Sequence, residues 1–292
     1  MDDRVRLRVD ARAELGEGPI WDPASGDLLW VDILGRRVHR FGPGSDTVGP
    51  DLVTDRDVGA VAPRRSGGLV LAVAGGFEVR GPGPAPTRNL IAVEGSLPGN
   101  RMNDGKCDPA GRFWAGTMAY DETPGAGSLY RLDPDLTVTT VFRDVTVSNG
   151  LGWSPDGRTM YYTDSGTGGV DRFRYDAGTG RIDTRERWVD IAESDGVPDG
   201  STVDAEGGVW VALWGGGAVR RYAPDGSLDR IVTLPCRLVT SCAFGGDDLD
   251  ELFITTAAYG LSGPELRRQP GAGGLFSVRP GVRGLAPVPF AG

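Results

Sequence analysis

The sequence predicts an all-β fold, a six-bladed β-propeller with four-stranded antiparallel blades. Three observations support this fold. A pattern of turns and short apolar strands repeats six times, Gly and Pro fall at regular turn positions, and no periodic helical segment exceeds a turn or two. Units of this length, each a meander of short strands, are typical of propeller blades. We therefore expect one domain over residues 1–292.

Each repeat runs from an apolar residue through a turn such as P-D-G or E-G-G into an apolar strand, then into a second turn and strand. Such turns supply the positive-φ positions that tight hairpins need. Successive repeats begin 39 to 50 residues apart. They start at Trp21, Val61, Cys107, Trp153, Val203 and Cys242.

The N-terminal segment Arg4–Asp10 has the pattern of a strand but no place in the first repeat. An unpaired edge strand at the end of the ring would be exposed. We expect this segment to pair with the last blade as its outer strand and to close the ring.

The composition excludes several classes of partner. The net charge is −9, the pI is about 4.8 and Lys is nearly absent, so nucleic acid and anionic membranes are poor partners. We expect no secretory signal, because the opening residues lack a basic segment followed by an apolar one, and no membrane span, because no apolar run is long enough. Three sparse cysteines indicate reduced thiols in a cytoplasmic protein; they are Cys107, Cys236 and Cys242.

His39 is the single histidine of the chain. A Ser-His-Asp triad or a His-ligated zinc site would have to be built on this one residue. Its position after an apolar run predicts a surface strand, with the imidazole facing solvent.

Oxygen-bearing side chains occur at one phase of the repeat, four residues before its start, in five of the six units. The first strand of each blade lines the central channel of a propeller, so these side chains should converge at one mouth of the channel. Turn residues are the alternative, since Asp and Asn favour turns, although Glu does not. The five residues are Glu17, Asp57, Asn103, Asn149 and Asp199, and Leu238 takes the sixth position.

A ring of carboxylate and amide oxygens suits one hard divalent cation, with Ca²⁺ the first expectation and Mn²⁺, Mg²⁺, Zn²⁺ or Fe²⁺ as alternatives. Two carboxylates would neutralise such an ion. We expect Glu17 and Asp199 as anionic ligands, with the neutral Asn149 beside them. Asp104 is expected to be structural, because strand alternation turns it away from Asn103.

Five motifs in order carry a family resemblance, which runs from about Glu14 to Phe276. The chain resembles the gluconolactonase / regucalcin / luciferin-regenerating-enzyme family. The resemblance implies a six-bladed propeller with one divalent metal that hydrolyses sugar lactones. The motifs are "GEGPIWDP", "RMNDGKCDPAGRFWAGTM", "SNGLGWSPDGRTMYYTDS", "PDGSTVDAEGGVWVALWGGG" and "TSCAFGGDDLDELFITTA".

By this resemblance, the residues that match the family's metal ligands are Glu17, Asn149 and Asp199. Arg101 and Asn103 match its substrate contacts. Asp121 is the nearest match for an acidic substrate contact after "GTMA", where the family often has Glu. Asp57 is a possible water-mediated or substrate contact.

The expected function is a metal-dependent lactonase that opens an aldonolactone to the aldonic acid, with a small-molecule sugar lactone as its partner. Asp199 would act as general base, and metal-bound hydroxide is the alternative account of the nucleophile. Alternatives are an esterase or phosphotriesterase on the same centre, a calcium-binding regulator, or a protein-interaction propeller. We expect specificity to lie in the loops over residues 75–100, 120–127 and 259–274.

Overall fold

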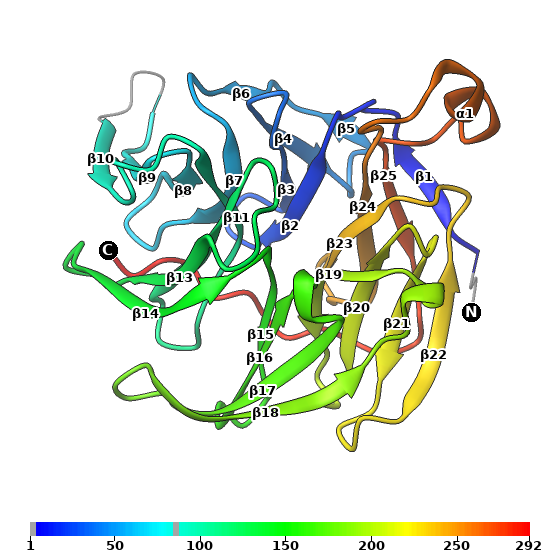
Figure 1. Ribbon diagram of the computed structural model, residues 1–292. Coiled ribbons are helices and arrows are strands. Elements are labelled where there is room, and N and C mark those ends of the chain that lie inside the picture. Colours follow the sequence, from blue (N-terminus) through cyan, green and yellow to red (C-terminus); the bar gives the residue numbers. More distant parts are fainter. Residues whose placement is uncertain (1–3, 84–87) are drawn as a thin grey trace.

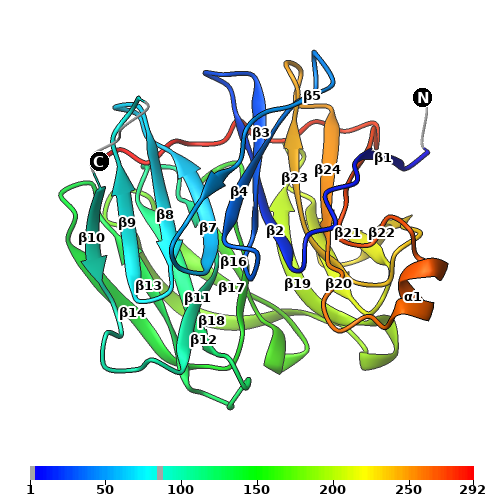
Figure 2. The same ribbon diagram turned by 90° about the horizontal axis from the view of Figure 1, so that it is seen from above.

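Six antiparallel sheets surround a central axis in the computed structural model, which describes residues 4–83 and 88–292 (Figure 1). Five sheets have four strands, and the sheet of blade 1 has five because two short outer strands both pair with β4. The predicted six-bladed propeller is therefore confirmed. The view turned by 90° shows the strands of the blades arranged around this axis (Figure 2).

The first half of the ring holds blades 1 to 3, in which consecutive strands pair. Their strands are β2 (Gly16–Asp22), β3 (Asp27–Asp32), β4 (Arg37–Gly42), β5 (Thr47–Val48) and β6 (Leu52–Val53); β7 (Val58–Pro63), β8 (Leu69–Val73), β9 (Gly76–Arg80) and β10 (Arg88–Ala92); and β11 (Asn100–Cys107), β12 (Phe113–Ala119), β13 (Gly127–Leu132) and β14 (Val138–Val145).

The second half holds blades 4 to 6, and blade 6 takes its outer strand from the N-terminus. Their strands are β15 (Ser148–Trp153), β16 (Thr159–Asp164), β17 (Gly169–Asp176) and β18 (Arg181–Asp190); β19 (Val197–Val203), β20 (Val209–Trp214), β21 (Ala218–Tyr222) and β22 (Leu228–Thr233); and β23 (Val239–Gly245), β24 (Glu251–Thr256), β25 (Leu275–Val278) and β1 (Arg6–Val9).

The ring closes as the sequence predicts. β1 pairs antiparallel with β25, with Leu7 opposite Phe276, and so completes the sheet that holds β23 and β24. Arg8 strengthens the closure, because its guanidinium binds Glu251 in β24 and Asp46 at 3.1 Å.

Helical structure is minor. The described residues form one short α-helix, α1 (Gly263–Arg268), and two 3₁₀ turns, η1 (Ser165–Thr167) and η2 (Glu193–Asp195). No helix within residues 4–83 or 88–292 is long and apolar enough to cross a membrane.

The blade cores hold two of the tryptophans that the repeat places there. Trp114 and Trp210 are fully buried, and each indole Nε1 donates to a buried carboxylate, to Asp108 Oδ2 at 2.9 Å and to Asp204 Oδ2 at 2.8 Å. The three cysteines are free and buried.

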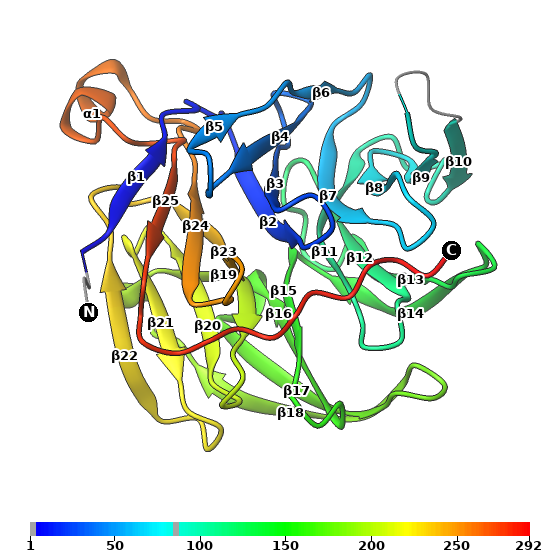
Figure 3. The same ribbon diagram turned by 180° about the vertical axis from the view of Figure 1, so that it is seen from behind.

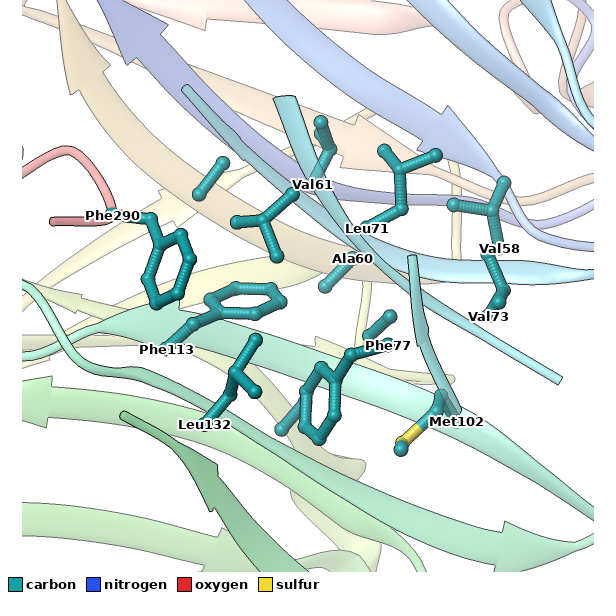
Figure 4. Packing of buried hydrophobic residues seen from close by; sticks show 14 of the residues in the cluster. Val58, Ala60, Val61, Leu71, Val73, Phe77, Met102, Phe113, Leu132 and Phe290 are labelled. Atoms are coloured by element: carbon teal, nitrogen blue, oxygen red, sulfur yellow. The ribbon is translucent and has the colours of Figure 1, made fainter. Parts of the chain in front are cut away.

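The C-terminal tail crosses one face of the ring (Figure 3). It hydrogen-bonds to turns that follow the first strands of several blades: Ala205 N donates to Arg283 O, and Arg65 N donates to Phe290 O, both at 2.8 Å. Phe290 is fully buried in a cluster with Val61 and Phe113 (Figure 4).

Two expectations from the sequence are wrong. His39 lies on a strand, β4, but it is buried, because its ring stacks on Trp30 at 4.9 Å and its Nδ1 bonds Asp51 at 2.7 Å. The segment from 75 to 100 is not only loop, because it contains β9 and β10.

Candidate functional site

In every blade, the pairing of the first strand with the second has a register shift. The shift lies close to the repeat position at which five of the blades have an oxygen-bearing side chain. A β-bulge re-aims the side chains beside it, so the same distortion recurs around the channel. These strands lie nearest the axis in Figure 1. The shifts lie between Glu17 and Ile20, Val58 and Ala60, Met102 and Gly105, Ser148 and Leu151, Pro198 and Ser201, and Val239 and Ser241.

Glycines at the bulges allow neighbouring first strands to approach closely. A Cβ on Gly59 would lie 2.2 Å from Asn103 O, and one on Gly200 would lie 2.1 Å from Ser241 Oγ. Any larger residue would push these strands apart. The glycine beside each ring position is therefore part of the packing of the channel.

Four of the predicted residues are buried at the mouth that lies away from the C-terminal tail. Glu17, Asn103 and Asn149 are each 4% exposed and Asp199 is 6% exposed. They lie near the starts of their strands, whereas the tail binds the turns beyond the strand ends. The carboxyl groups of Glu17 in blade 1 and Asp199 in blade 5 lie close enough in the channel for each to shift the pKa of the other.

Burial and mutual repulsion make these carboxyls weak acids. Burial, and next the Asp104 carboxylate, raise the pKa of Glu17 to about 8. Burial, followed by the Glu17 and Asp104 charges, raises the pKa of Asp199 well above its usual range. Strongly shifted carboxyls in a channel are a frequent mark of a functional site.

Two asparagines connect the neighbouring blades. Asn103 Nδ2 donates to Asn149 Oδ1 at 3.1 Å and to Ser148 O at 2.8 Å. Asn149 Nδ2 donates to Ser165 Oγ at 2.8 Å, so its Oδ1 faces the side of Asn103. The Asn149 amide is thus held in one orientation by two partners.

Arg101 occupies the rim of the same mouth. Its Nη1 donates to Asn103 Oδ1 at 2.6 Å, and its guanidinium carbon lies 5.9 Å from the centre of the Tyr120 ring. Burial lowers the pKa of Arg101, and Tyr120, Glu17, Asp57 and Asp199 oppose this. Arg101 and Asn103, both predicted substrate contacts, therefore lie together.

Asp57 is held by other protein groups. Its Oδ1 accepts from Arg36 Nε at 2.8 Å, and its Oδ2 accepts from the Tyr120 hydroxyl at 2.6 Å. Both oxygens are directed to these partners, although Asp57 shares the phase of the other ring members. Asp57 therefore supports the rim through Tyr120.

Asp121 lies apart from the buried group. It is exposed, and its Oδ1 accepts from the backbone nitrogen of Thr123 at 3.1 Å and from the Thr123 hydroxyl at 2.7 Å. The structure does not bring it together with Asn103 or Asp199. Its role in substrate binding stays a prediction.

The donor chemistry at the mouth fits a hard divalent cation. Glu17 and Asp199 are buried and repel each other, and a cation between them would relieve the repulsion. Among the described residues, no three His, Cys, Asp or Glu side chains are arranged to hold a metal ion, so a site here needs the amide oxygen of Asn149. Glu17, Asn149 and Asp199 could supply the protein oxygens, and water would complete the coordination.

A cavity of ≈ 430 Å³ lies at the opposite end of the channel. Trp21, Trp153 and Phe244 contribute to its walls, together with residues 285–288 of the C-terminal tail. It is largely apolar and does not include the acidic mouth. The candidate site is therefore the buried polar group rather than this cavity.

Sequence reasoning missed three residues at the site. Tyr120, Ser165 and Arg36 lie outside the repeat phase, and they reach the site from loops or from the end of a second strand. Asp104, expected to be structural, acts electrostatically on both Glu17 and Asp199. The bulge in β11 explains this, because it breaks the alternation on which that expectation relied.

Comparisons with known proteins identify the family of the chain. A family model described as "SMP-30/Gluconolactonase/LRE-like region" matches residues 15–258. Regucalcin from Xenopus laevis is 40% identical over 99% of both chains. A Bacillus subtilis (strain 168) protein, named provisionally as a sugar lactone lactonase, is 39% identical over 98% of both chains.

Solved structures show the same fold along nearly the whole chain. A calcium-binding protein, regucalcin, from Agrobacterium tumefaciens has a TM-score of 0.94 at 33% identity, covering 98% of this chain and 97% of that one. A luciferin-regenerating enzyme has a TM-score of 0.91 at 33% identity, covering 99% of both chains. The protein therefore belongs to the SMP-30/gluconolactonase/LRE-like family.

Proposed function

We propose that this protein is a metal-dependent sugar-lactone hydrolase that opens an aldonolactone to the aldonic acid. The observation that supports it best is the pair of buried carboxyls, Glu17 and Asp199, which meet in the channel close to the rim formed by Arg101 and Asn103. A relative that is named provisionally as a sugar lactone lactonase supports the same reaction class.

The bound divalent ion would act as a Lewis acid on the lactone carbonyl. Glu17, Asn149 and Asp199 would hold that ion. Asp199 is also the general base: it accepts a proton from the water that attacks the carbonyl carbon, and it returns this proton to the ring oxygen as the ring C–O bond breaks. The bound cation would lower the pKa that burial raises, so the position of Asp199 beside the reacting carbon, rather than a high basicity, would make it effective.

Arg101 and Asn103 orient the sugar. The guanidinium and the amide can donate hydrogen bonds to substrate hydroxyls or the ring oxygen, and Tyr120 supports Arg101 from the outer side. Their burial strengthens such bonds, because competing water is scarce.

Calcium binding without catalysis is the second candidate. The Agrobacterium tumefaciens neighbour is described as a calcium-binding protein, and the same oxygen set would bind Ca²⁺ in either role. An esterase or phosphotriesterase would use the same centre with different pocket walls. Turnover of substrates separates these functions.

The decisive experiment is hydrolysis of five- and six-carbon aldonolactones by protein stripped with a chelator and resupplied with one divalent ion at a time. We expect one or more ions to restore the rate. Asp199→Ala should lose roughly 10²–10⁴-fold in kcat, since general-base catalysis contributes about that much. Asp121→Asn is an informative comparison, because Asp121 is exposed and apart from the buried group.

Three results would contradict the proposal. Tight Ca²⁺ binding without any lactone turnover would favour the regulator. Faster hydrolysis of aryl esters or phosphotriesters than of lactones would favour the esterase. An Asp199→Ala variant as active as the unmodified protein would remove Asp199 from the mechanism.

A further inference from the structure

Lys106 is the only lysine in the sequence. The chain has 31 Lys and Arg residues, and all of them except Lys106 are arginine. Lysine and arginine are not interchangeable at confined sites: an ammonium is a compact point charge, whereas a guanidinium is wide, planar and needs more acceptors. The exception lies in β11, one of the strands that line the channel.

The Lys106 side chain crosses the channel. Its Nζ donates to Ser201 O at 2.5 Å, so it extends from blade 3 past blade 4 to blade 5. Lys106 also lines the cavity near the C-terminal tail. The ammonium therefore lies between that cavity and the buried polar group at the other mouth.

Space around this side chain is limited. A Cβ on Gly150 would lie 2.5 Å from Ser201 Oγ, and a Cβ on Gly105 would lie 2.7 Å from Trp114 O. β15 and β19 thus approach as closely as glycine allows, and so do β11 and β12 within blade 3. A slender lysine chain suits this gap better than a guanidinium does.

Asp104, two residues before Lys106 on β11, is the carboxylate whose charge acts most strongly on Lys106. Burial lowers the pKa of Lys106, and Asp104 opposes the lowering by attraction. Asp104 is 4% exposed; its Oδ1 accepts from Gly105 N at 2.7 Å, and its Oδ2 has no hydrogen-bond partner. Asp104 also repels both Glu17 and Asp199, so its charge reaches the candidate metal ligands.

We propose that Lys106 sets the charge of the candidate metal centre. Its ammonium offsets the Asp104 carboxylate, which leaves Glu17 and Asp199 as the two negative charges that match a divalent ion. Lys106 is a positioning residue in this role and touches no substrate. The inference rests on the metal-binding part of the proposed function and not on lactone turnover.

The proposal predicts a change in ion preference. Without the ammonium, three carboxylates act on the bound ion, and Coulomb attraction then favours a trivalent over a divalent cation. Removing the Asp104 charge instead should disfavour trivalent ions. Removing both charges should restore the original preference.

The test compares Tb³⁺ with Ca²⁺ binding, using Tb³⁺ luminescence and competition by Ca²⁺ in the absence of lactone. We expect Lys106→Met to raise the Tb³⁺/Ca²⁺ affinity ratio on the order of tenfold. Asp104→Asn should lower the ratio, and the double variant should return to within about twofold of the unmodified protein. Arg131→Met is the matched control, because Arg131 is partly buried, pairs with Asp133 and lies on β13 away from the first strands.

Two results would overturn the proposal. In the first, Lys106→Met changes the Tb³⁺/Ca²⁺ affinity ratio no more than Arg131→Met does. In the second, the double variant keeps the altered ratio of Lys106→Met. The second result would make Asp104 a direct metal ligand.

A measurement on the unmodified chain covers the case in which Lys106→Met does not fold. One lysine gives one side-chain amine signal in a protein labelled with ¹⁵N-lysine. Saturating Ca²⁺ should shift this signal, and an unchanged signal would overturn the inference. A protein that binds Ca²⁺ but opens no lactone would refute the proposed hydrolase while leaving this test valid.

Discussion

Asn103 donates a hydrogen bond from Nδ2 to Oδ1 of Asn149 at 3.1 Å and thereby joins blade 3 to blade 4 at the channel mouth. The other end of the Asn149 amide donates to Ser165 Oγ at 2.8 Å, and Ser165 Oγ donates to Pro198 O at 2.6 Å. Pro198 directly precedes Asp199. Ser165 thus connects two candidate metal ligands without being one of them.

Replacing Ser165 with alanine should weaken metal binding. The Asn149 amide would lose the partner of its Nδ2 and could turn its oxygen away from the ion. Partners of metal ligands typically contribute about 10–100-fold to affinity, and we expect a loss in that range for Ca²⁺, measured by isothermal titration calorimetry. Ser154→Ala is the control, since Ser154 bonds Asp156 in the turn beyond β15. Equal affinities of the two variants would show that Ser165 has no such role.

Tyr120→Phe should impair substrate binding more than chemistry. The variant keeps the ring beside Arg101 but removes the hydroxyl that donates to Asp57 at 2.6 Å. A hydrogen bond to a charged group contributes about 1.5–3 kcal/mol; we expect part of this loss to reach Arg101 and to raise KM for an aldonolactone roughly threefold to tenfold. Steady-state kinetics check this. Tyr161→Phe, on β16 and packed against Trp188, should leave KM unchanged; a fall in kcat alone would contradict the prediction.

The sequence predicted features that recur with the repeat and missed those that depend on one particular loop. Glu17 was found because it shares a phase with Asn149 and Asp199, and that phase lies beside the bulge of every first strand. Asp57 has the same phase, but Arg36 from the preceding blade and Tyr120 from the next one take both of its oxygens.

The same distinction holds for single residues elsewhere. Trp114 and Trp210, on the apolar strands of the repeat, are fully buried in the blade cores, whereas Trp214 on the same kind of strand is only half-buried. The periodic pattern could not show that Asp51, twelve residues away, and Trp30 would enclose His39. Such contacts form only when the strands pair, so spacing along the chain carries no signal for them.

Glu78 should make the free energy of unfolding depend on pH in the acid range. Burial raises its pKa, but hydrogen bonds from Arg88 and Arg80 outweigh burial, so the pKa lies below its usual 4.5. The unfolded chain then takes up a proton at higher pH than the folded one. The stabilisation by ionised Glu78 is therefore complete well above pH 4.5 and is lost as the pH falls through the lowered pKa.

Urea unfolding of Glu78→Gln measures this contribution. The side chain is 5% exposed, and removing one partner of a buried ion pair costs about 3–5 kcal/mol, so we expect a loss near the lower end of that range at pH 7. The difference from the unmodified protein should shrink below pH 4.5. Glu186→Gln is the control: Glu186 pairs with Arg172 on the surface, where such pairs contribute about 0–1 kcal/mol. A Glu78 effect that is independent of pH would refute the ionic explanation.

The C-terminal tail stabilises the ring through Phe290. Its backbone nitrogen donates to Pro63 O and its carbonyl accepts from Arg65 N, both at 2.8 Å, which fixes the tail on blade 2. The fully buried ring then fills the space between Val61 and Phe113, where blades 2 and 3 meet (Figure 4). One side chain outside the repeats thus completes a core that two blades share.

Phe290→Ala should therefore destabilise the fold while sparing the candidate site. Deleting a buried aromatic side chain costs about 3–5 kcal/mol, because the cavity collapses only partly. The urea midpoint should fall clearly, whereas Ca²⁺ affinity at low urea should be unchanged, since the acidic mouth lies at the other end of the channel. Leu285→Ala, on the same tail but 37% exposed, should lower the midpoint much less. Equal effects of the two substitutions would mean that the tail acts through its backbone contacts rather than through the Phe290 ring.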